Sequence, residues 1–151
     1  MMSKKSKNKN KKKQLQNKCP HCSSGPETFR YVKNMYRFDV DMARAFLADG
    51  RDPIELEPDD VRYSVDNTRI YPEHLEHVNL KYPGIIAHYW FPEKDGTILH
   101  GHLLIDGNHR AARSLQLGAP FFVQVLTEDE SREILMEGPD IESILAEHAL
   151  V

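Results

Sequence analysis

The stretch 85–105 most constrains the fold of this chain, because it has the pattern of two strands joined by a turn. Residues 85–91 are rich in β-branched and aromatic side chains, and residues 98–105 repeat that character. Between them, Asp95 and Gly96 form a dipeptide that is typical of hairpin turns. The sequence therefore predicts a β-hairpin in this region.

The predicted hairpin continues into a helix and a third strand. Gly107 breaks the second strand, residues 111–117 have the apolar spacing of a helix, and residues 121–126 form another strand-like run. A helix between two strands makes a β-α-β unit, so we expect strands 98–105 and 121–126 to be neighbours in one sheet. These elements predict the α+β class, with a small mixed sheet and flanking helices.

The other elements are predicted from shorter patterns. Asp39 or Asp41 can cap a helix that ends at Gly50, and Thr127 with Glu130 forms a capping box. Residues 59–70 show no clear period. In chain order, the expected elements are a helix over 40–49, a strand over 54–57, a short helix over 72–78, and helices over 128–136 and 140–149.

The charge of the chain is divided sharply between its first 18 residues and the rest. Residues 1–18 hold eight lysines and no acidic group, whereas residues 19–151 have a formal charge of -11. We expect residues 1–18 to be a disordered tail, residues 19–38 a linker, and residues 39–151 one domain. The acidic domain argues against a broad nucleic-acid-binding face, so weak nucleic-acid contacts are expected through the lysine-rich tail alone.

The predicted linker contains the two cysteines of the chain, Cys19 and Cys22, on either side of Pro20 and His21. This pair fits a zinc knuckle completed by distant ligands, a redox pair, or two incidental thiols. Two cysteines do not make a disulfide framework. No apolar run has the roughly 20 residues of a membrane helix, and no apolar core follows the N-terminal lysines as in a signal peptide. We therefore expect a cytoplasmic protein without a membrane partner.

The segment from Asp106 to Ala112 carries the pattern of a binding site, with a strand end, a glycine break and a helix start. The N–H groups at a helix start lack internal partners, and the helix dipole adds positive potential there. Gly107 permits a close approach to a ligand, and Arg110 offers a two-pronged contact to a phosphate or carboxylate. The segment fits an anion site; alternatively, Asp106 caps the helix and pairs with Arg110, with nothing bound.

The same segment resembles a known family signature. The ParB/sulfiredoxin-like superfamily has a segment that is similar to Ile105-Asp106-Gly107-Asn108-His109-Arg110-Ala111-Ala112, followed by Leu117-Gly118 and a strand over 120–126. The resemblance implies a nucleotide-binding domain with the phosphates of ATP or CTP at the helix start. It implies that Gly107, Asn108, His109, Arg110 and Ala111 form the binding segment. Gly107 would then be the close-approach glycine, with His109 and Arg110 as phosphate contacts.

Two branches of that superfamily differ from this chain. Sulfiredoxins place their reactive cysteine immediately before the His-Arg pair, where this chain has Asn108, so cysteine-sulfinate repair is excluded. Partition proteins carry a helix-turn-helix domain after the nucleotide domain, and we expect none here because the chain ends near the last predicted helices. The free serine kinases, with Asp-Gly-His-His-Arg, are nearest in motif.

The similarity to the free serine kinases implies a phosphotransferase that uses Mg-ATP and an unidentified small-molecule acceptor. Asp106 would hold Mg²⁺, and Asp106 and His109 are the candidate catalytic residues of the motif. Those kinases also bear an acidic residue early in the domain as a candidate base. Glu55 and Glu57 occupy a comparable region here, although alternating acids on a strand are also ordinary surface residues.

Two other functions stay open at this point. One is a non-catalytic nucleotide-gated module that binds a protein or a nucleic acid. The other is a metal-binding protein centred on His100, His102 and His109, with His88 from the paired strand and Asp106 as the carboxylate. A His-x-His pair on a strand places both imidazoles on one face, which is the basis of this third hypothesis.

Overall fold

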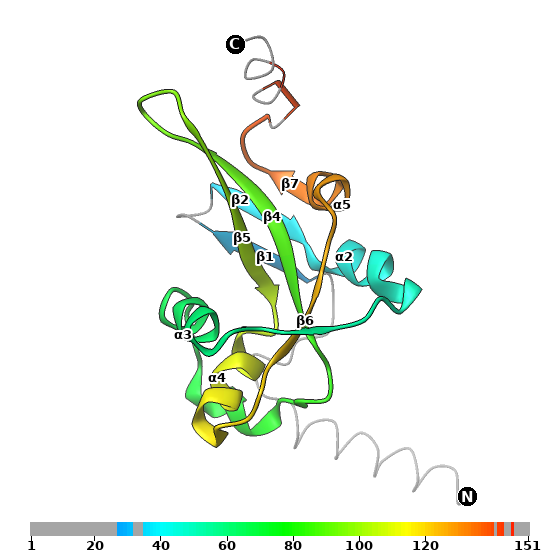
Figure 1. Cartoon of the computed structure of the whole chain (residues 1–151), viewed down its shortest axis with the longest axis vertical. Helices are drawn as coiled ribbons and strands as arrows, with labels where there is room; N and C mark the ends of the chain where they lie inside the picture. Colours follow the sequence, from blue (N-terminus) through cyan, green and yellow to red (C-terminus); the bar gives the residue numbers. More distant parts are fainter. Residues whose placement is uncertain (1–26, 32–34, 141, 144–145, 147–151) are drawn as a thin grey trace, which may run out of the picture.

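The computed structural model describes residues 27–31, 35–140, 142–143 and 146, which form an α+β fold (Figure 1). The strands are β1 (Thr28–Tyr31), β2 (Tyr36–Asp39), β3 (Ile54–Glu55), β4 (Gly84–Pro92), β5 (Ile98–Asp106), β6 (Phe122–Val125) and β7 (Leu135–Glu137). The helices are α2 (Val40–Phe46), α3 (Pro58–Asp66), α4 (Asn108–Leu117) and α5 (Glu128–Glu133), with the 3₁₀ turns η1 (Leu47–Asp49) and η2 (Pro72–His77). The fold class predicted from the sequence is confirmed.

The long hairpin β4–β5 is the centre of the fold, as predicted. The two strands pair antiparallel from Ile86 opposite Leu104 to Pro92 opposite Ile98. At the turn, the Thr97 amide donates to Asp95 Oδ1 at 2.9 Å. Figure 1 shows the hairpin in green, with its turn at one end of the molecule and α4 beyond the other end.

The expected neighbour relation between β5 and β6 is wrong. The described strands form two sheets, with the orders β1-β2-β7 and β3-β6-β4-β5, so β4 lies between β5 and β6. β6 pairs in parallel with β4, and a parallel pair needs a long connection, which β5 and α4 together supply. The hairpin occupies one edge of β4, and the chain leaving α4 therefore joins the sheet along the other edge.

Each face of the second sheet carries its own hydrophobic cluster. Successive side chains of a strand point to opposite faces, and Ile85 and Ile86 accordingly belong to different clusters. The first cluster joins the hairpin to the first sheet and to α2 through Tyr36, Phe38, Ala43, Leu47, Ile85, Ala87, Ile105, Leu126 and Ile134. The second lies against α3 and α4 and contains Val61, Ile86, Leu104, Ala111, Phe121 and Val123.

Part of the predicted linker over 19–38 belongs to the folded domain, so the predicted boundary at residue 39 is wrong. β1 and β2 lie within that range, and Tyr36 and Phe38 are only 0% and 1% exposed. The Tyr36 hydroxyl also donates to the Trp90 carbonyl at 2.5 Å. Strands of four residues are too short to show a clear period in the sequence. The predicted tail and the Cys19–Cys22 pair lie outside the described residues.

The predicted helix over 40–49 is confirmed as α2 followed by η1. Asp39 caps it, since its Oδ1 accepts from the Met42 amide at 3.0 Å, and Gly50 ends η1 with a φ of 77°. By contrast, α3 occupies a stretch without a visible period. Val61 is its one buried side chain, so no apolar stripe marks it in the sequence.

The C-terminal part of the described chain differs from the predicted helix over 128–136. The Thr127–Glu130 capping box is present, but α5 ends at Glu133 and β7 follows as an edge strand beside β2. The predicted helix over 140–149 falls largely outside the described residues. None of the described helices has the length and apolar character that crossing a bilayer requires.

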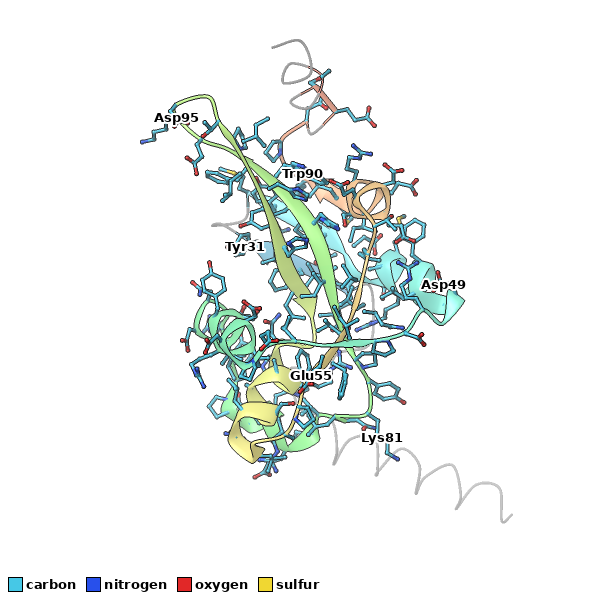
Figure 2. The ribbon with its side chains drawn as sticks, viewed as in Figure 1. Tyr31, Asp49, Glu55, Lys81, Trp90 and Asp95 are labelled. Atoms are coloured by element: carbon cyan, nitrogen blue, oxygen red, sulfur yellow. The ribbon has the colours of Figure 1, made fainter. Side chains whose placement is uncertain are left out.

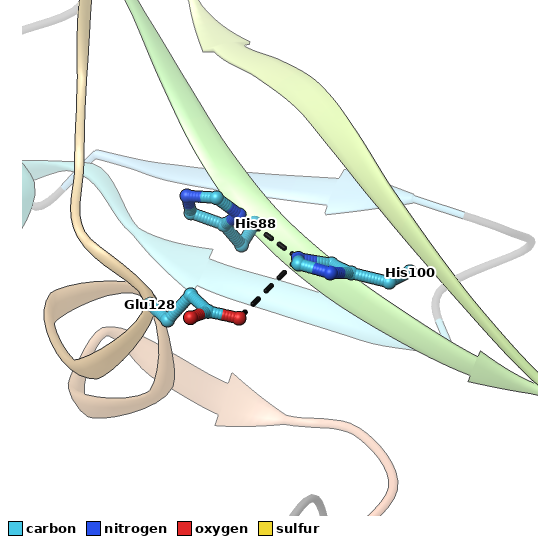
Figure 3. Close-up of side chains that lie close together, drawn as sticks. All are labelled: His88, His100 and Glu128. Carbon is cyan, nitrogen blue, oxygen red and sulfur yellow. Dashed lines mark hydrogen bonds and ion pairs between the residues drawn. The ribbon is translucent and has the colours of Figure 1, made fainter.

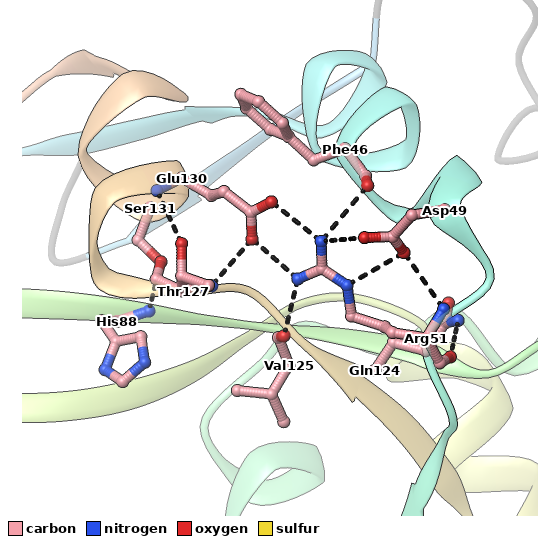
Figure 4. Close-up of polar contacts among 9 residues, drawn as sticks. All are labelled: Phe46, Asp49, Arg51, His88, Gln124, Val125, Thr127, Glu130 and Ser131. Atoms are coloured by element: carbon pink, nitrogen blue, oxygen red, sulfur yellow. Dashed lines mark hydrogen bonds and ion pairs between the residues drawn. The ribbon is translucent and has the colours of Figure 1, made fainter.

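Arg51 ties three parts of the fold together (Figure 4). Its guanidinium donates to both carboxylate oxygens of Glu130 on α5 at 2.7 and 2.8 Å. It also donates to Asp49 at the end of η1, and to the carbonyls of Phe46 and Val125. Because the Glu130 carboxylate simultaneously accepts from the Thr127 amide, the arginine fixes the first turn of α5 against β6.

The Glu130 carboxylate should stabilise the fold in a pH-dependent way. Hydrogen bonds from Arg51 lower the pKa of Glu130 from 4.5 to about 2. A lowered pKa stabilises the folded state fully above about pH 4.5, and this contribution is lost as the pH falls toward 2. We expect Glu130→Gln to reduce the free energy of unfolding by about 1–3 kcal/mol at pH 7 in urea titrations, after allowance for solvent screening.

Asp59→Asn is the matched control, because the Asp59 side chain pairs with Arg62 while it is 96% exposed. This control should leave the unfolding midpoint nearly unchanged. Equal losses in the two variants, or a Glu130→Gln loss that is the same at pH 7 and pH 3, would contradict the assigned role of the Arg51–Glu130 pair.

Candidate functional site

The start of α4 is built on a left-handed glycine. Gly107 is the N-cap residue with a φ of 97°, and the Ala111 amide donates to its carbonyl at 2.8 Å to begin the helix. A Cβ on Gly107 would lie 2.9 Å from the Gly84 Cα, so a side chain has no room there. The close approach predicted for Gly107 is therefore made to the backbone at the start of β4.

Among the described residues, no side chain caps α4 through a hydrogen bond, so the usual Ser, Thr or Asp cap does not occupy the positive end of its dipole. Asn108, its first residue, is only 7% exposed. Its Nδ2 donates to the Leu104 carbonyl at 3.0 Å, while its Oδ1 accepts no hydrogen bond from the residues that the structure describes. A buried acceptor without a donor costs about 1–3 kcal/mol, which a ligand or water that donates there would recover.

Two cavities meet at this helix start. The larger one, of about 750 Å³, lies between β1, the stretch 67–71 and α4. The smaller one, of about 330 Å³, lies between α2, η2 and α4. Both are lined by Glu27, Asp106, Gly107, Asn108 and His109, so the motif predicted from the sequence forms the wall that they share.

The charged side chains around the two cavities are mostly basic. Among the described residues, Arg30 and Arg69 line the larger cavity, and Arg44 and Arg110 line the smaller one. The acidic residues of the lining are Glu27 and Asp106, which pair with Arg44 and Arg110. Arg30 pairs with Glu137 outside the lining. Four guanidinium groups against these three carboxylates favour an anionic ligand, although the chain from residue 19 onward is acidic as a whole.

The predicted capping of α4 by Asp106 is wrong, whereas the predicted pairing of Asp106 with Arg110 is confirmed. Asp106 Oδ2 accepts from Arg110 Nη2 at 3.1 Å and from Arg44 Nη2 at 3.1 Å. Arg44 Nη2 also donates to Glu27 Oε2 at 2.8 Å. The two carboxylates and two guanidinium groups form one connected network on the shared wall.

Glu27 is the acidic residue of this site that the sequence analysis missed. Burial first, and then the negative charge of Asp106, raise the pKa of the Glu27 carboxyl, while Arg44 opposes the rise. A carboxyl with a raised pKa in the wall of a cavity is a candidate proton acceptor. It was missed because the range 19–38 was assigned to a linker.

His109 lines both cavities, and the protein holds its ring in place. Its Nε2 accepts from the Tyr71 amide at 3.1 Å, which places a ring proton on Nδ1. The His109 ring also stacks on Tyr71, with ring centroids 5.8 Å apart, and meets His74 edge-on at 4.6 Å. These contacts orient the His109 ring in the wall that the two cavities share.

The structure does not bring Glu55 and Glu57 to this site. Both line neither of the two cavities. Glu55 lies on β3, which is at the opposite edge of the sheet from β5 and Asp106, and Glu57 directly precedes α3 (Figure 2 labels Glu55). Glu55 and Glu57 precede the Asp106–Arg110 segment in the sequence, as the candidate base does in the free serine kinases. In the structure, the strands between β3 and β5 separate them from that segment.

The histidines predicted to bind a metal are only partly brought together. His88, His100 and His102 lie on one face of the hairpin, with ring centroids 4.6 to 5.7 Å apart. His109 packs elsewhere, against Tyr71, and Asp106 belongs to the arginine network. The carboxylate near these histidines is that of Glu128 on α5, which sequence spacing gave no reason to select (Figure 3).

Comparison of the chain with protein-family models, with curated proteins and with solved structures finds no match. The resemblance to the ParB/sulfiredoxin-like superfamily therefore stays a prediction. The function has to be inferred from the geometry of the site.

The network can be tested through the titration of Glu27. We expect Asp106→Asn to lower the pKa of Glu27, because it removes the neighbouring negative charge, and Arg44→Gln to raise it further, because it removes a stabilising positive charge. The carboxyl ¹³C shift of Glu27, followed against pH in both variants, measures each change. If the pKa of Glu27 were the same in wild type and in both variants, Glu27, Asp106 and Arg44 would not be coupled.

Proposed function

We propose that this protein binds a nucleotide, ATP or CTP with Mg²⁺, and transfers a phosphoryl group to a small-molecule acceptor. The observation that carries the proposal is the start of α4, which lacks a side-chain cap and opens onto two cavities lined by four arginines. Such a helix start offers backbone N–H groups and positive potential to a phosphate.

The shape of the site supports a ligand with two parts. The larger cavity, of about 750 Å³, is within the range of small-molecule and cofactor sites. The smaller cavity shares its wall and could take the acceptor. The phosphates would then lie at Asn108 and Arg110, between the two compartments, which is the arrangement that in-line transfer requires.

The side chains of the shared wall suggest which residue binds the phosphate, which holds Mg²⁺ and which accepts the proton. Arg110 uses one nitrogen for Asp106, and a guanidinium has five N–H donors, so the others can reach a phosphate. Asp106 carries oxygen ligands of the kind that Mg²⁺ prefers. Glu27, with its raised pKa, would take the proton of the acceptor hydroxyl as the phosphoryl group moves to that oxygen. Glu27 thus replaces Glu55 and Glu57 as the proposed base.

We further propose that the protein works in the cytoplasm. Nucleotide-dependent transfer needs a compartment that holds nucleotides. Cys19 and Cys22 are the two cysteines of the chain, and two are too few for a disulfide framework. This low number favours a reducing environment.

Arg110→Ala should weaken nucleotide binding. Loss of a hydrogen bond to a charged group costs about 1.5–3 kcal/mol, or roughly a 10- to 150-fold rise in Kd. Isothermal titration with ATP, ADP, CTP and GTP in the presence of Mg²⁺ measures the effect, and thermal unfolding without nucleotide shows that the variant is folded. Arg113→Ala is the matched control, since Arg113 is on the same helix and lines neither cavity.

The outcomes separate the proposed functions. Binding that is lost in Arg110→Ala and kept in Arg113→Ala supports the site, and deletion of residues 2–18 should then leave Kd unchanged. Equal Kd values for wild type and Arg110→Ala would remove Arg110 from the site. Binding without phosphoryl transfer to any of a panel of hydroxyl acceptors would instead indicate the nucleotide-gated module.

A further inference from the structure

A second cluster of ligand-type side chains lies on the hairpin, away from α4. The register places His88 opposite His102 and Trp90 opposite His100, so all four side chains share one face of β4–β5. α5 brings Glu128 to the same face (Figure 3). His88 Nδ1 is 2.9 Å from His100 Nε2, and that nitrogen is 3.7 Å from Glu128 Oε1.

We infer that His88, His100 and Glu128 form a binding site for a divalent transition-metal cation, with Zn²⁺ as the best fit. A tetrahedral Zn²⁺ with ligand distances of about 2.0–2.1 Å holds its ligand atoms about 3.3–3.4 Å apart. The observed separations of 2.9 and 3.7 Å lie on either side of this value, and all three ligand atoms are within 4.8 Å of one another. Two imidazoles and a carboxylate also match the ligand types that Zn²⁺ accepts.

The backbone that carries the three ligands is held in position before any cation arrives. The His88 amide donates to Ser131 Oγ at 2.9 Å, which fixes β4 to α5. The first turn of α5, where Glu128 lies, is fixed by the capping box and by the Arg51–Glu130 pair (Figure 4). The His100 ring stacks on Trp90, with centroids 4.8 Å apart and planes at 11°. Ligands on a backbone that is already fixed lose less entropy on binding.

The charges on α5 also bear on a cation at this cluster. Its first turn carries the acidic residues Glu128, Asp129 and Glu130. Arg132, 6.0 Å from the Trp90 ring, is the nearby positive charge on α5.

The site would have three protein ligands and a fourth position open to solvent. The side chains of His100 and Glu128 are 40% and 57% exposed, so water can complete the coordination. The cation would join the hairpin to α5 and would not require the nucleotide site, because none of its three ligands lines the two cavities at α4.

Zinc titration of the metal-free full-length chain tests this site. Cys19→Ser and Cys22→Ser are introduced first, so that thiols outside the described residues do not bind the metal. We expect one equivalent of Zn²⁺ to bind by isothermal titration and to raise the unfolding temperature. His100→Gln and Glu128→Gln, both at exposed positions, should each raise the Kd for Zn²⁺ at least about tenfold while their unfolding temperatures without metal stay unchanged.

His77→Gln is the matched control, because His77 is an exposed histidine on η2, beside His74 and outside the cluster. It should leave the Kd for Zn²⁺ unchanged. The inference is overturned if no stoichiometric Zn²⁺ binds, which would show the 2.9 Å contact to be only a hydrogen bond between imidazoles. It is equally overturned if binding survives in both cluster variants or is lost in His77→Gln.

Discussion

The turn from β5 into α4 depends on the absence of a side chain at Gly107. Its φ of 97° and the 2.9 Å that would separate its Cβ from the Gly84 Cα leave glycine as the residue that fits. The strand can therefore become a helix within one residue. As a result, Asp106 at the end of β5 and Asn108 at the start of α4 lie on one wall, and the cavities on both sides of that wall share them.

The charged side chains of the wall between the two cavities determine its chemistry. The negative charge of Asp106 contributes to the raised pKa of Glu27. Arg44 pairs with both carboxylates, and Arg110 pairs with Asp106. A phosphate that reached Arg110 would compete with Asp106 for the guanidinium. Mg²⁺ bound to Asp106 would relieve that competition. The cation would give Asp106 the positive partner that it loses when Arg110 binds the phosphate. The proposed nucleotide and metal would thus stabilise each other at one wall.

Features of the fold that depend on neighbouring residues could be predicted from the sequence. The hairpin, the helix after Gly107, the Asp39 cap and the Thr127–Glu130 capping box are of this kind, since each is encoded within a few positions. The pairing of β6 with β4 could not be predicted from local pattern. β5 already pairs with one edge of β4 in the hairpin, so β6 joins the sheet at the other edge of β4.

The acidic residues of both clusters depend on contacts between distant parts of the chain. Glu27 meets Asp106 only because β1, from a stretch assigned to a linker, lies beside the motif, and Glu128 meets His100 only because α5 covers the hairpin face. Conversely, Glu55 was selected for its place in the sequence, and the sheet order puts it at the opposite edge from Asp106. Tertiary structure, more than local pattern, decides which carboxylates accompany each motif.

The most direct measurement is a titration of the ¹⁵N-labelled full-length chain with Mg-ATP, followed through its backbone amide resonances. Nucleotide binding at the start of α4 predicts the largest shifts at Gly107, Asn108, His109 and Arg110, with the amides of α5 left nearly unchanged. Absence of shifts at millimolar Mg-ATP, or shifts confined to residues outside the two cavities, would contradict the assignment of this helix start as the phosphate site.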